Sequence, residues 1–274
     1  AETSHIGGRL LPAYGEVFSR MIPFSWRFIR VWQRNRDVFL SLWHSEAPGF
    51  VAEPIIILLA MGLGLGAYVG LVDGQKYIDF VAPGVIASYA MFSASFECTY
   101  GTFVRMEYQK TFDAIIATPV SVDDVTAGEI FWGATRSLLT GSIVLVIAAA
   151  FQLVHSPWAV FIPVVAFLEG LMFAAIAILF TSIVPSLYSF NYYISLFITP
   201  MFYFSGVFFP LSSFPEIVQN LSRVVPLTPV VQLTRALISG EFQLDLLWAF
   251  AFIIVLTSIF FSVSLVTMRR RLIV

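Results

Sequence analysis

The chain has 274 residues, of which 58% are hydrophobic and only 12% are charged, and its formal net charge is -2. This number of charged side chains is too small to cover the surface of a soluble domain of this size. Most of the surface is therefore expected to face lipid. The single cysteine, Cys98, excludes a disulfide framework or a thiolate zinc site within one chain. We therefore expect an all-α membrane protein that crosses the bilayer several times.

Residues 14–44 are predicted to form an amphipathic interface helix before the first span. Apolar side chains recur there at helical spacing, on both sides of Pro23: Tyr14, Val17, Phe18, Met21, Ile22, Trp26, Ile29 and Trp32. The same stretch carries the basic residues Arg20, Arg27, Arg30, Arg34 and Arg36. A basic amphipathic helix that bears tryptophan is typical of the membrane interface. The first thirty residues hold no apolar core of signal-peptide length, so we expect no cleaved signal.

Crossing the hydrocarbon core takes about 20 helical residues, and six apolar segments are long enough. They are residues 54–72, 80–104, 132–154, 158–184, 187–209 and 246–268. The uncharged run over residues 170–215 is too long for one crossing, and "VPSLYSFN" at 184–191 supplies a break. Residues 210–244, interrupted by four prolines, predict short helices outside the membrane before the last span.

Lysine and arginine set the orientation of a membrane protein, because cytoplasmic loops carry an excess of them. Of the 15 such residues, only Lys76, Arg223 and Arg235 lie on the side opposite to the termini when six spans are assumed. Both termini are therefore expected in the cytoplasm, together with the polar loop at residues 105–129.

The motifs give no support to an enzyme. "GLGLGAYVG" at 62–70 lacks the third glycine of a dinucleotide-binding loop, and its glycines at 62, 66 and 70 instead favour close packing of one helix face. The two lysines, Lys76 and Lys110, do not stand in a phosphate-binding loop, so this chain is not expected to hydrolyse ATP. The three histidines are far apart and predict no metal site.

Several residues in or near the spans are candidates for a substrate path. Glu97 and Glu169 are ionisable groups within spans, where such groups are costly and often functional. Each is expected either to line a cavity or connect helices, or else to be packed, hydrogen-bonded or protonated. Phe202, Phe204 and Phe208 belong to an aromatic cluster that is either an interfacial belt or an exit for a lipid-like substrate.

The loop at residues 105–129 predicts a short, charged helix-turn-helix. Met106, Phe112 and Ile116 recur at near-helical spacing, and Pro119 ends that helix. Asp123 and Asp124 then precede the next helix, where the positive end of the helix dipole stabilises carboxylates. A helix this short is marginal in water, so it needs the N-terminal helix, lipid headgroups or a soluble partner to pack against.

Two long stretches carry a resemblance to a known family. "SASFECTYGTFVRMEYQKTFDAIIATPVSVDDVTAGEIFWGATRS" resembles the cytoplasmic loop of ABC-2 type transporter permeases, in which a charged helix precedes a "TP" turn and a "GE" start to the next span. "ITPMFYFSGVFFPLSSFPEIVQNLSRVVPLTPVVQLTRALISG" looks like the outer segment of the same family, and the closing "RRRLIV" fits as well. Within the family the chain is most similar to the nodulation-factor export permeases. The resemblance covers most of the chain, so residues 1–274 are expected to form one ABC-2 type transmembrane domain.

The resemblance implies a homodimer of six-span permeases that carries two copies of a separate ABC ATPase, similar to that of the nodulation-factor exporters. The helix at residues 107–118 would then be the coupling helix that docks into the ATPase. Its expected polar contacts are Arg105, Glu107, Lys110 and Asp113, with Phe112 as an apolar anchor. ATP and magnesium would bind the partner, and no cofactor is expected in this chain.

The resemblance also implies export of an amphipathic cargo from a bacterial inner membrane, with a lipo-oligosaccharide or glycolipid as the first choice. Such a cargo would enter from the inner leaflet between the first and fifth spans. The alternatives are efflux of a drug or another lipid within the family, an ATP-independent channel or proton-coupled carrier, and a scaffold or sensor without transport. No nucleic-acid partner is expected.

Overall fold

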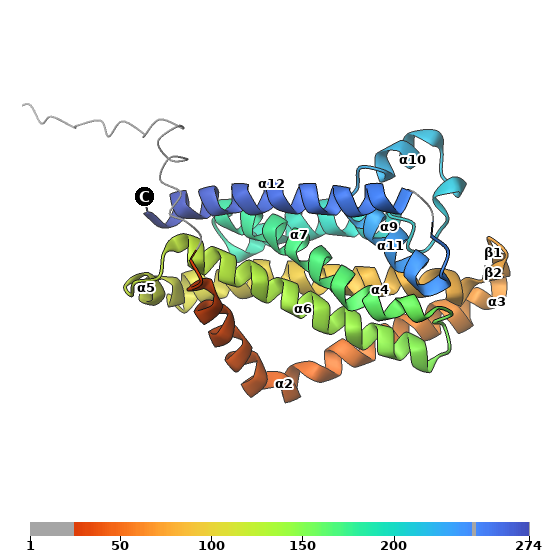
Figure 1. Ribbon diagram of the computed structural model, residues 1–274, viewed down its shortest axis with the longest axis horizontal. Helices are drawn as coiled ribbons and strands as arrows, with labels where there is room; N and C mark the ends of the chain where they lie inside the picture. Colours follow the sequence, from red (N-terminus) through yellow and green to blue (C-terminus); the bar gives the residue numbers. More distant parts are fainter. Residues whose placement is uncertain (1–24, 243–244, 274) are drawn as a thin grey trace, which may run out of the picture.

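The computed structural model describes residues 25–242 and 245–273, which form a bundle of long helices (Figure 1). Five helices in this part of the chain are long and apolar enough to cross a membrane: Val51–Val69, Tyr77–Tyr108, Val122–Ala150, Pro157–Ile183 and Asp245–Ile273. They match five of the six predicted spans. The structure confirms an all-α, multi-pass membrane protein, with the fifth predicted span as the exception described below.

The chain enters the bundle through α2 (Phe28–Leu59), which bends into two limbs (Figure 1). Pro48 and Pro54 lie inside this helix, and proline removes a backbone hydrogen bond and clashes with the preceding turn. The first limb is the described part of the predicted interface helix; residues 14–24 lie outside the described residues. It packs on α6 (Val122–Ala150), where Trp32 Nε1 donates to Thr135 Oγ1 at 2.8 Å.

The second limb continues through a π-helical turn, Ala60–Leu65, into α3 (Gly66–Val69). A Cβ on Gly62 would lie 2.3 Å from Ile78 Cδ1, so this glycine does permit close packing. Gly70 instead has φ +71° and starts a small hairpin of β1 (Leu71–Val72) and β2 (Gln75–Lys76). The predicted glycine face therefore ends before Gly70.

The second span is longer than predicted. It consists of α4 (Tyr77–Phe96) and two π-helical turns, Glu97–Gly101 and Val104–Tyr108. Lys110 then adopts a left-handed conformation with φ 52°, and α5 (Thr111–Ile116) follows. The helix predicted over 107–118 is therefore divided, because the left-handed residue separates Glu107 from α5.

The third and fourth spans pack closely. Helix α6 begins at a capping box in which Ser121 Oγ accepts from Asp124 N at 3.1 Å and Asp124 Oδ2 accepts from Ser121 N at 3.2 Å. After the 3-10 turn Pro157–Phe161 comes α7 (Ile162–Ile183). A Cβ on Gly170 would lie 2.7 Å from Ala134 Cα, so the two helices touch backbone to backbone at this position.

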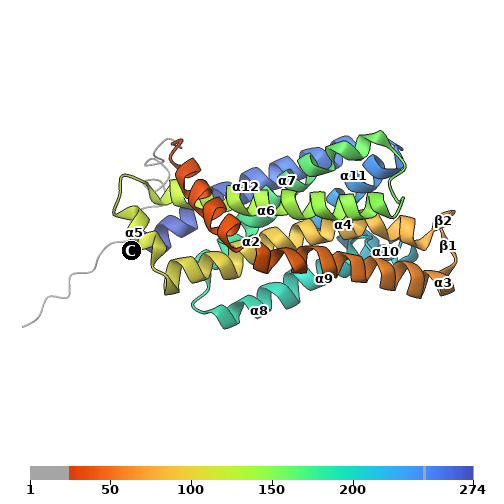
Figure 2. The ribbon, with the colours of Figure 1, turned by 90° about the horizontal axis from the view of Figure 1, so that it is seen from below.

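The fifth predicted span, residues 187–209, is helical only as far as Phe204. It is built from a 3-10 turn, Leu187–Ser189, then α8 (Phe190–Tyr192), a π-helical turn, Tyr193–Ile198, and α9 (Thr199–Phe204). Figure 2 shows α8 and α9 running beside the bundle. The helix ends at Phe204, and Gly206 follows in a left-handed conformation with φ +78°. This segment is not among the five long, apolar helices.

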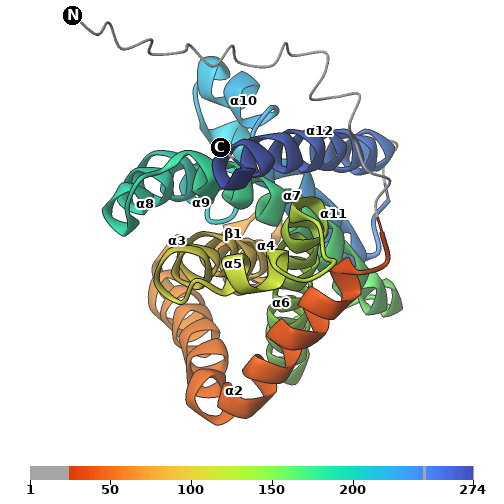
Figure 3. The ribbon, with the colours of Figure 1, turned by 90° about the vertical axis from the view of Figure 1, so that its left-hand side faces the viewer.

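The predicted short helices before the last span are present. They are the 3-10 turn Leu211–Ser213, α10 (Glu216–Ser222) and α11 (Leu227–Ser239), followed by α12 (Asp245–Ile273). These helices lie with the β hairpin at one end of the bundle, here called the hairpin end. Helix α5, the start of α2 and the end of α12 lie at the other, the loop end (Figures 1 and 2). Viewed from the loop end, α12 and α8–α9 flank one side of the central helices and the bend of α2 the other (Figure 3).

The contact at Gly170 gives a test of the packing. Gly170→Ala is expected to lower the free energy of unfolding by about 1–3 kcal/mol, because the new methyl group must separate α6 from α7. Gly64→Ala is the control, since nothing lies within 4 Å of its Cβ position. Thermal unfolding of the two purified variants in the same detergent measures the difference, and equal midpoints would contradict the packing argument.

Candidate functional site

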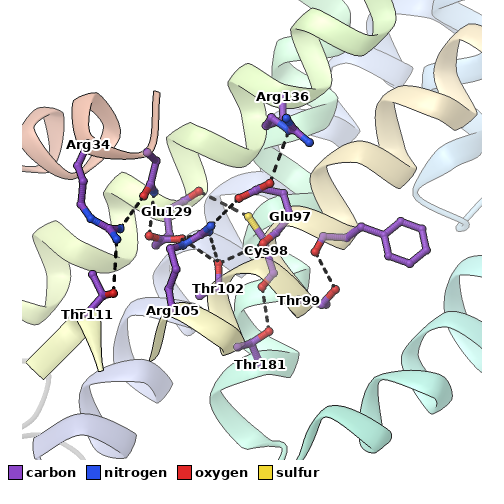
Figure 4. A network of polar contacts seen from close by, with 12 residues as sticks. Arg34, Glu97, Cys98, Thr99, Thr102, Arg105, Thr111, Glu129, Arg136 and Thr181 are labelled. Carbon is purple, nitrogen blue, oxygen red and sulfur yellow. Dashed lines mark hydrogen bonds and ion pairs between the residues drawn. The ribbon is translucent and has the colours of Figure 1, made fainter. Parts of the chain in front are cut away.

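The most concentrated polar chemistry in the described residues is an ion cluster around Arg105, near the loop end (Figure 4). Arg105 Nη1 donates to Glu97 Oε1 at 2.8 Å, and its Nη2 donates to Glu129 Oε2 at 2.5 Å. The side chains of Arg105, Glu97 and Glu129 are 15%, 14% and 1% exposed. A buried charge is tolerated when it is paired and hydrogen-bonded, and here each charge has a partner of opposite sign.

Glu129 also connects three segments that are distant in sequence. Asn35 Nδ2 on α2 donates to Glu129 Oε1 at 2.9 Å, and Thr102 Oγ1 donates to Oε2 at 2.8 Å. Glu129 itself lies on α6. The carboxylate therefore holds the first limb of α2, the extension of α4 and the start of α6 in one arrangement.

Two further arginines extend the cluster toward α2 and the loop (Figure 4). Arg136 Nε lies 3.6 Å from Glu97 Oε2, and its guanidinium lies 4.6 Å from the centre of the Phe39 ring. Arg34 Nη2 donates to Thr111 Oγ1 of α5 at 3.4 Å. Burial lowers the pKa of the Arg34 guanidinium from its ordinary value, and the carboxylate of Glu129 acts in the opposite direction.

The basic end of α12 is tied to the same region. Arg269 pairs with Asp123 at the start of α6. Arg271 Nη2 donates to Glu107 Oε1 at 2.7 Å, and its Nη1 donates to the carbonyls of Thr181 at 2.5 Å and Val184 at 2.7 Å. In the sequence these arginines indicated only the orientation in the membrane. Their spacing does not identify acidic partners that are about 150 residues away in the chain.

The structure separates the five residues predicted to contact an ATPase. Lys110 and Asp113 are exposed, and Glu107 is 35% exposed while bound to Arg271. Phe112 is 1% exposed and belongs to the core, and Arg105 lies inside the ion cluster. Arg105 and Phe112 thus lie within the bundle whereas Lys110 and Asp113 face outward, and contact of any of the five residues with an ATPase stays a prediction.

The residues predicted to line a substrate path are also divided. Glu97 lies in the ion cluster and borders a cavity, and its role in a substrate path stays a prediction. Glu169 is 1% exposed, and its Oε1 has no hydrogen-bond partner among the described residues. Phe202 and Phe208 pack against each other with ring centres 4.9 Å apart, whereas Phe204 is 44% exposed and lines a groove between α9 and α10.

Two neighbouring cavities open beside the ion cluster and share Phe39 and Arg136. The polar cavity, of about 390 Å³, is bordered by the charged and amide side chains of Arg34, Asn35, Glu97, Arg105 and Gln109, and also by apolar side chains that include Val38, Leu42, Val104 and Trp132. The apolar cavity, of about 310 Å³, is lined by Leu40, Trp43, Val51, Leu139 and Ile143. A polar and an apolar compartment side by side suit a molecule that has both kinds of surface.

Comparison with known proteins also indicates a membrane transporter. The sequence profile described as ABC-2 type transporter matches residues 26–242, a range that contains the ion cluster and α5.

Named relatives cover most of the chain. It is 38% identical to Nodulation protein J of Sinorhizobium fredii over 211 residues, which is 77% of this chain and 80% of that protein. It is 35% identical to Nodulation protein J of Neorhizobium galegae over 271 residues, which is 94% of this chain and 99% of that protein. It is 23% identical to the Inner membrane transport permease YadH of Escherichia coli over 242 residues, which is 88% of this chain and 93% of that protein.

Loss of the central guanidinium tests the ion cluster. Arg105→Gln is expected to lower the free energy of unfolding by about 3–5 kcal/mol, because it leaves the buried Glu129 without its cation and leaves Glu97 only the more distant Arg136. Replacing Glu97 and Glu129 by glutamine in the same chain should recover part of this loss, since it removes the uncompensated charges. Thermal unfolding in detergent is the measurement.

Arg30→Gln is the matched control for that series. Arg30 is exposed, and its Nη1 donates a hydrogen bond of 3.4 Å to Gln33 Oε1. Its removal is expected to leave the unfolding midpoint unchanged. If Arg105→Gln and Arg30→Gln unfold at the same temperature, the ion cluster does not hold the three segments together.

Proposed function

The chain belongs to the ABC-2 type transporter family, and on this basis we propose that it exports an amphipathic lipo-oligosaccharide or glycolipid across a bacterial inner membrane. Membership makes it a multi-pass transmembrane subunit of an ABC transporter rather than the ATPase, and it implies an ABC ATPase partner. The identity of the cargo, the location in a bacterial inner membrane and the outward direction of transport are proposals.

The observation that carries the cargo proposal is the pair of cavities that meet at Phe39 and Arg136. A sugar headgroup with hydroxyl and amide groups can exchange hydrogen bonds with the side chains that border the polar cavity. An acyl chain can occupy the apolar cavity, where it removes apolar surface from water. The relatives named Nodulation protein J support a lipo-oligosaccharide as the first substrate to test.

The proposed ATPase contact is the outward surface of α5 and the residues around it. The exposed residues there are Tyr108, Gln109, Lys110, Asp113, Ala114, Ala117 and Thr118. In this proposal Phe112 and Arg105 act from within, by attaching the contact surface to the bundle. ATP and magnesium would bind the partner, which would be present in two copies on a permease homodimer.

Coupling then follows from differential binding. An ATP-bound partner that prefers one arrangement of the permease shifts the population toward it, and a partner with equal affinity for both arrangements shifts nothing. Because Arg34 donates to Thr111 and Glu129 joins α2 to α6, displacement of α5 strains these contacts. The proposed orientation puts the loop end in the cytoplasm, in agreement with its concentration of arginines.

Two other functions remain as alternatives. A permease for a drug or another lipid would use the same cavities with a different headgroup preference. An ATP-independent channel or proton-coupled carrier would move its solute without a partner. Transport by the purified chain alone in liposomes would favour the channel or carrier.

A charge reversal on α5 tests the docking surface. Asp113→Lys is expected to weaken association with the ATPase by roughly tenfold, because an exposed carboxylate at the contact is replaced by an opposite charge. Co-purification and the affinity of the detergent-solubilised complex are the measurements. Glu216→Lys on α10 is the control, since it makes the same change at the hairpin end. Equal affinity of the two variants would remove α5 from the docking surface.

A cavity-filling substitution tests the cargo. Leu139→Trp places a larger side chain in the apolar cavity and is expected to reduce glycolipid-stimulated ATP turnover several-fold. Val146→Trp is the control, because Val146 lies seven residues further along α6 and is 68% exposed. ATP turnover of the complex in liposomes is measured with a lipo-oligosaccharide and with its chain-free oligosaccharide. Stimulation by the chain-free sugar to the same extent would contradict an amphipathic cargo.

A further inference from the structure

A second polar cavity, of about 650 Å³, opens at the hairpin end between α10, α11 and the start of α12. Helix α11 presents a polar side to it, with Thr228, Gln232, Arg235 and Ser239 at helical spacing. The opposite side of α11 is apolar and buried, so the helix is fixed in the bundle with its polar side toward the cavity. This cavity shares no lining residue with the polar and apolar cavities near the loop end.

Two residues that line the cavity each have a buried polar atom without a hydrogen-bond partner among the described residues: Thr228 Oγ1 and Arg235 Nε. The guanidinium of Arg235 also packs over the Phe80 ring, 4.3 Å from its centre. Thr228 is 2% exposed. Arg235 Nη2 donates to the carbonyls of Gly206 at 2.9 Å and Phe80 at 3.3 Å, and no carboxylate is bonded to this guanidinium in the described part of the chain. Buried polar groups without partners are rare and costly, so these two atoms indicate a ligand that supplies oxygen atoms.

The charge of Arg235 makes an oxyanion the fitting acceptor. Burial lowers its pKa to about 10, with the charge of Asp73 acting in the opposite direction, and the group stays cationic near neutral pH. Arg223 adds a second guanidinium at the rim of the cavity. Guanidinium groups bind phosphate through paired, charge-assisted hydrogen bonds.

The same cavity also carries two carboxylates, so a ligand that has only negative charge is not expected there. Glu241 and Asp245 line it beside the two arginines, so a ligand with negative charge alone meets repulsion there. A ligand with a phosphate next to an ammonium group satisfies both signs. On α12 the wall continues with Trp248, which is 70% exposed, and Phe252, so an apolar surface extends from the charged groups.

We propose that this cavity binds the headgroup of a phospholipid in which a phosphate lies beside a primary ammonium group, as in phosphatidylethanolamine. Arg235, Arg223 and Thr228 hold the phosphate, and Glu241 and Asp245 accept hydrogen bonds from the ammonium. The glycerol and acyl chains lie along Trp248 and Phe252. This binding needs neither the ATPase nor the exported cargo.

Lipid binding to the delipidated, purified full chain tests the proposal directly. Native mass spectrometry in detergent compares phosphatidylethanolamine, phosphatidylglycerol and phosphatidylcholine with identical acyl chains. The first is expected to bind roughly tenfold more tightly than the other two. Phosphatidylglycerol lacks the cation, and the trimethylammonium group of phosphatidylcholine cannot donate a hydrogen bond. Inorganic phosphate and soluble glycerophosphoethanolamine are added as competitors.

Variants then assign the preference to the cavity. Thr228→Val and Arg223→Gln are expected to weaken the binding of all three lipids, because the phosphate is common to them. Glu241→Gln with Asp245→Asn is expected to make phosphatidylethanolamine and phosphatidylglycerol bind equally, because it removes the acceptors of the ammonium group. Arg223 is exposed, so its variant is expected to fold. Lys76→Gln is the control, because it removes an exposed cation at the same end but outside the cavity lining.

Several results would overturn the proposal. Equal binding of the three lipids would remove headgroup recognition, and an unchanged lipid affinity in Arg223→Gln and Thr228→Val would locate phosphate binding elsewhere. Inorganic phosphate that competes as strongly as the lipid would assign the cavity to a free anion. A phosphate-free glycolipid that binds more tightly than phosphatidylethanolamine would assign it to a sugar.

Discussion

The guanidinium of Arg105, enclosed between Glu97 and Glu129, is the interaction on which the arrangement of the loop end depends. Three such charges in an apolar bundle are tolerated only together, because each without its partner would carry a desolvation cost of several kcal/mol. The cluster therefore has strict geometric requirements. It fixes the extension of α4 against α6 and, through Asn35, against the first limb of α2.

Contacts at the loop end also hold α5 on the bundle, although a helix of six residues would not be stable alone. In α5 the side chain of Phe112 is buried in the bundle, and Arg271 and Arg34 connect the residues in and beside α5 to α12 and α2. A force on its exposed side is therefore carried into packed helices rather than absorbed by a flexible loop. Packed interiors of this kind respond by moving between discrete arrangements.

The sequence predicted what depends on local patterns and missed what depends on contacts between distant residues. Apolar length identified five spans, and the proline-rich segment identified the short helices before the last one. The early end of the fifth span was not predictable, because it depends on Gly206, whose carbonyl is held by Arg235. Arg105 and Phe112 were assigned to a docking surface from the family resemblance, which does not show that distant parts of the chain pack around their side chains.

Helix α4 relates the two polar regions of the molecule. Its C-terminal end leads directly into Glu97 of the ion cluster, and near its N-terminal end the carbonyl of Phe80 accepts a hydrogen bond from Arg235. These positions are about 25 Å apart along the helix axis. Helix α4 is buried along most of this length, but Pro83 lies between the two positions and removes a backbone hydrogen bond near the N-terminal end. The hairpin-end cavity and the ion cluster are thus connected by one buried helix that has a proline close to Phe80.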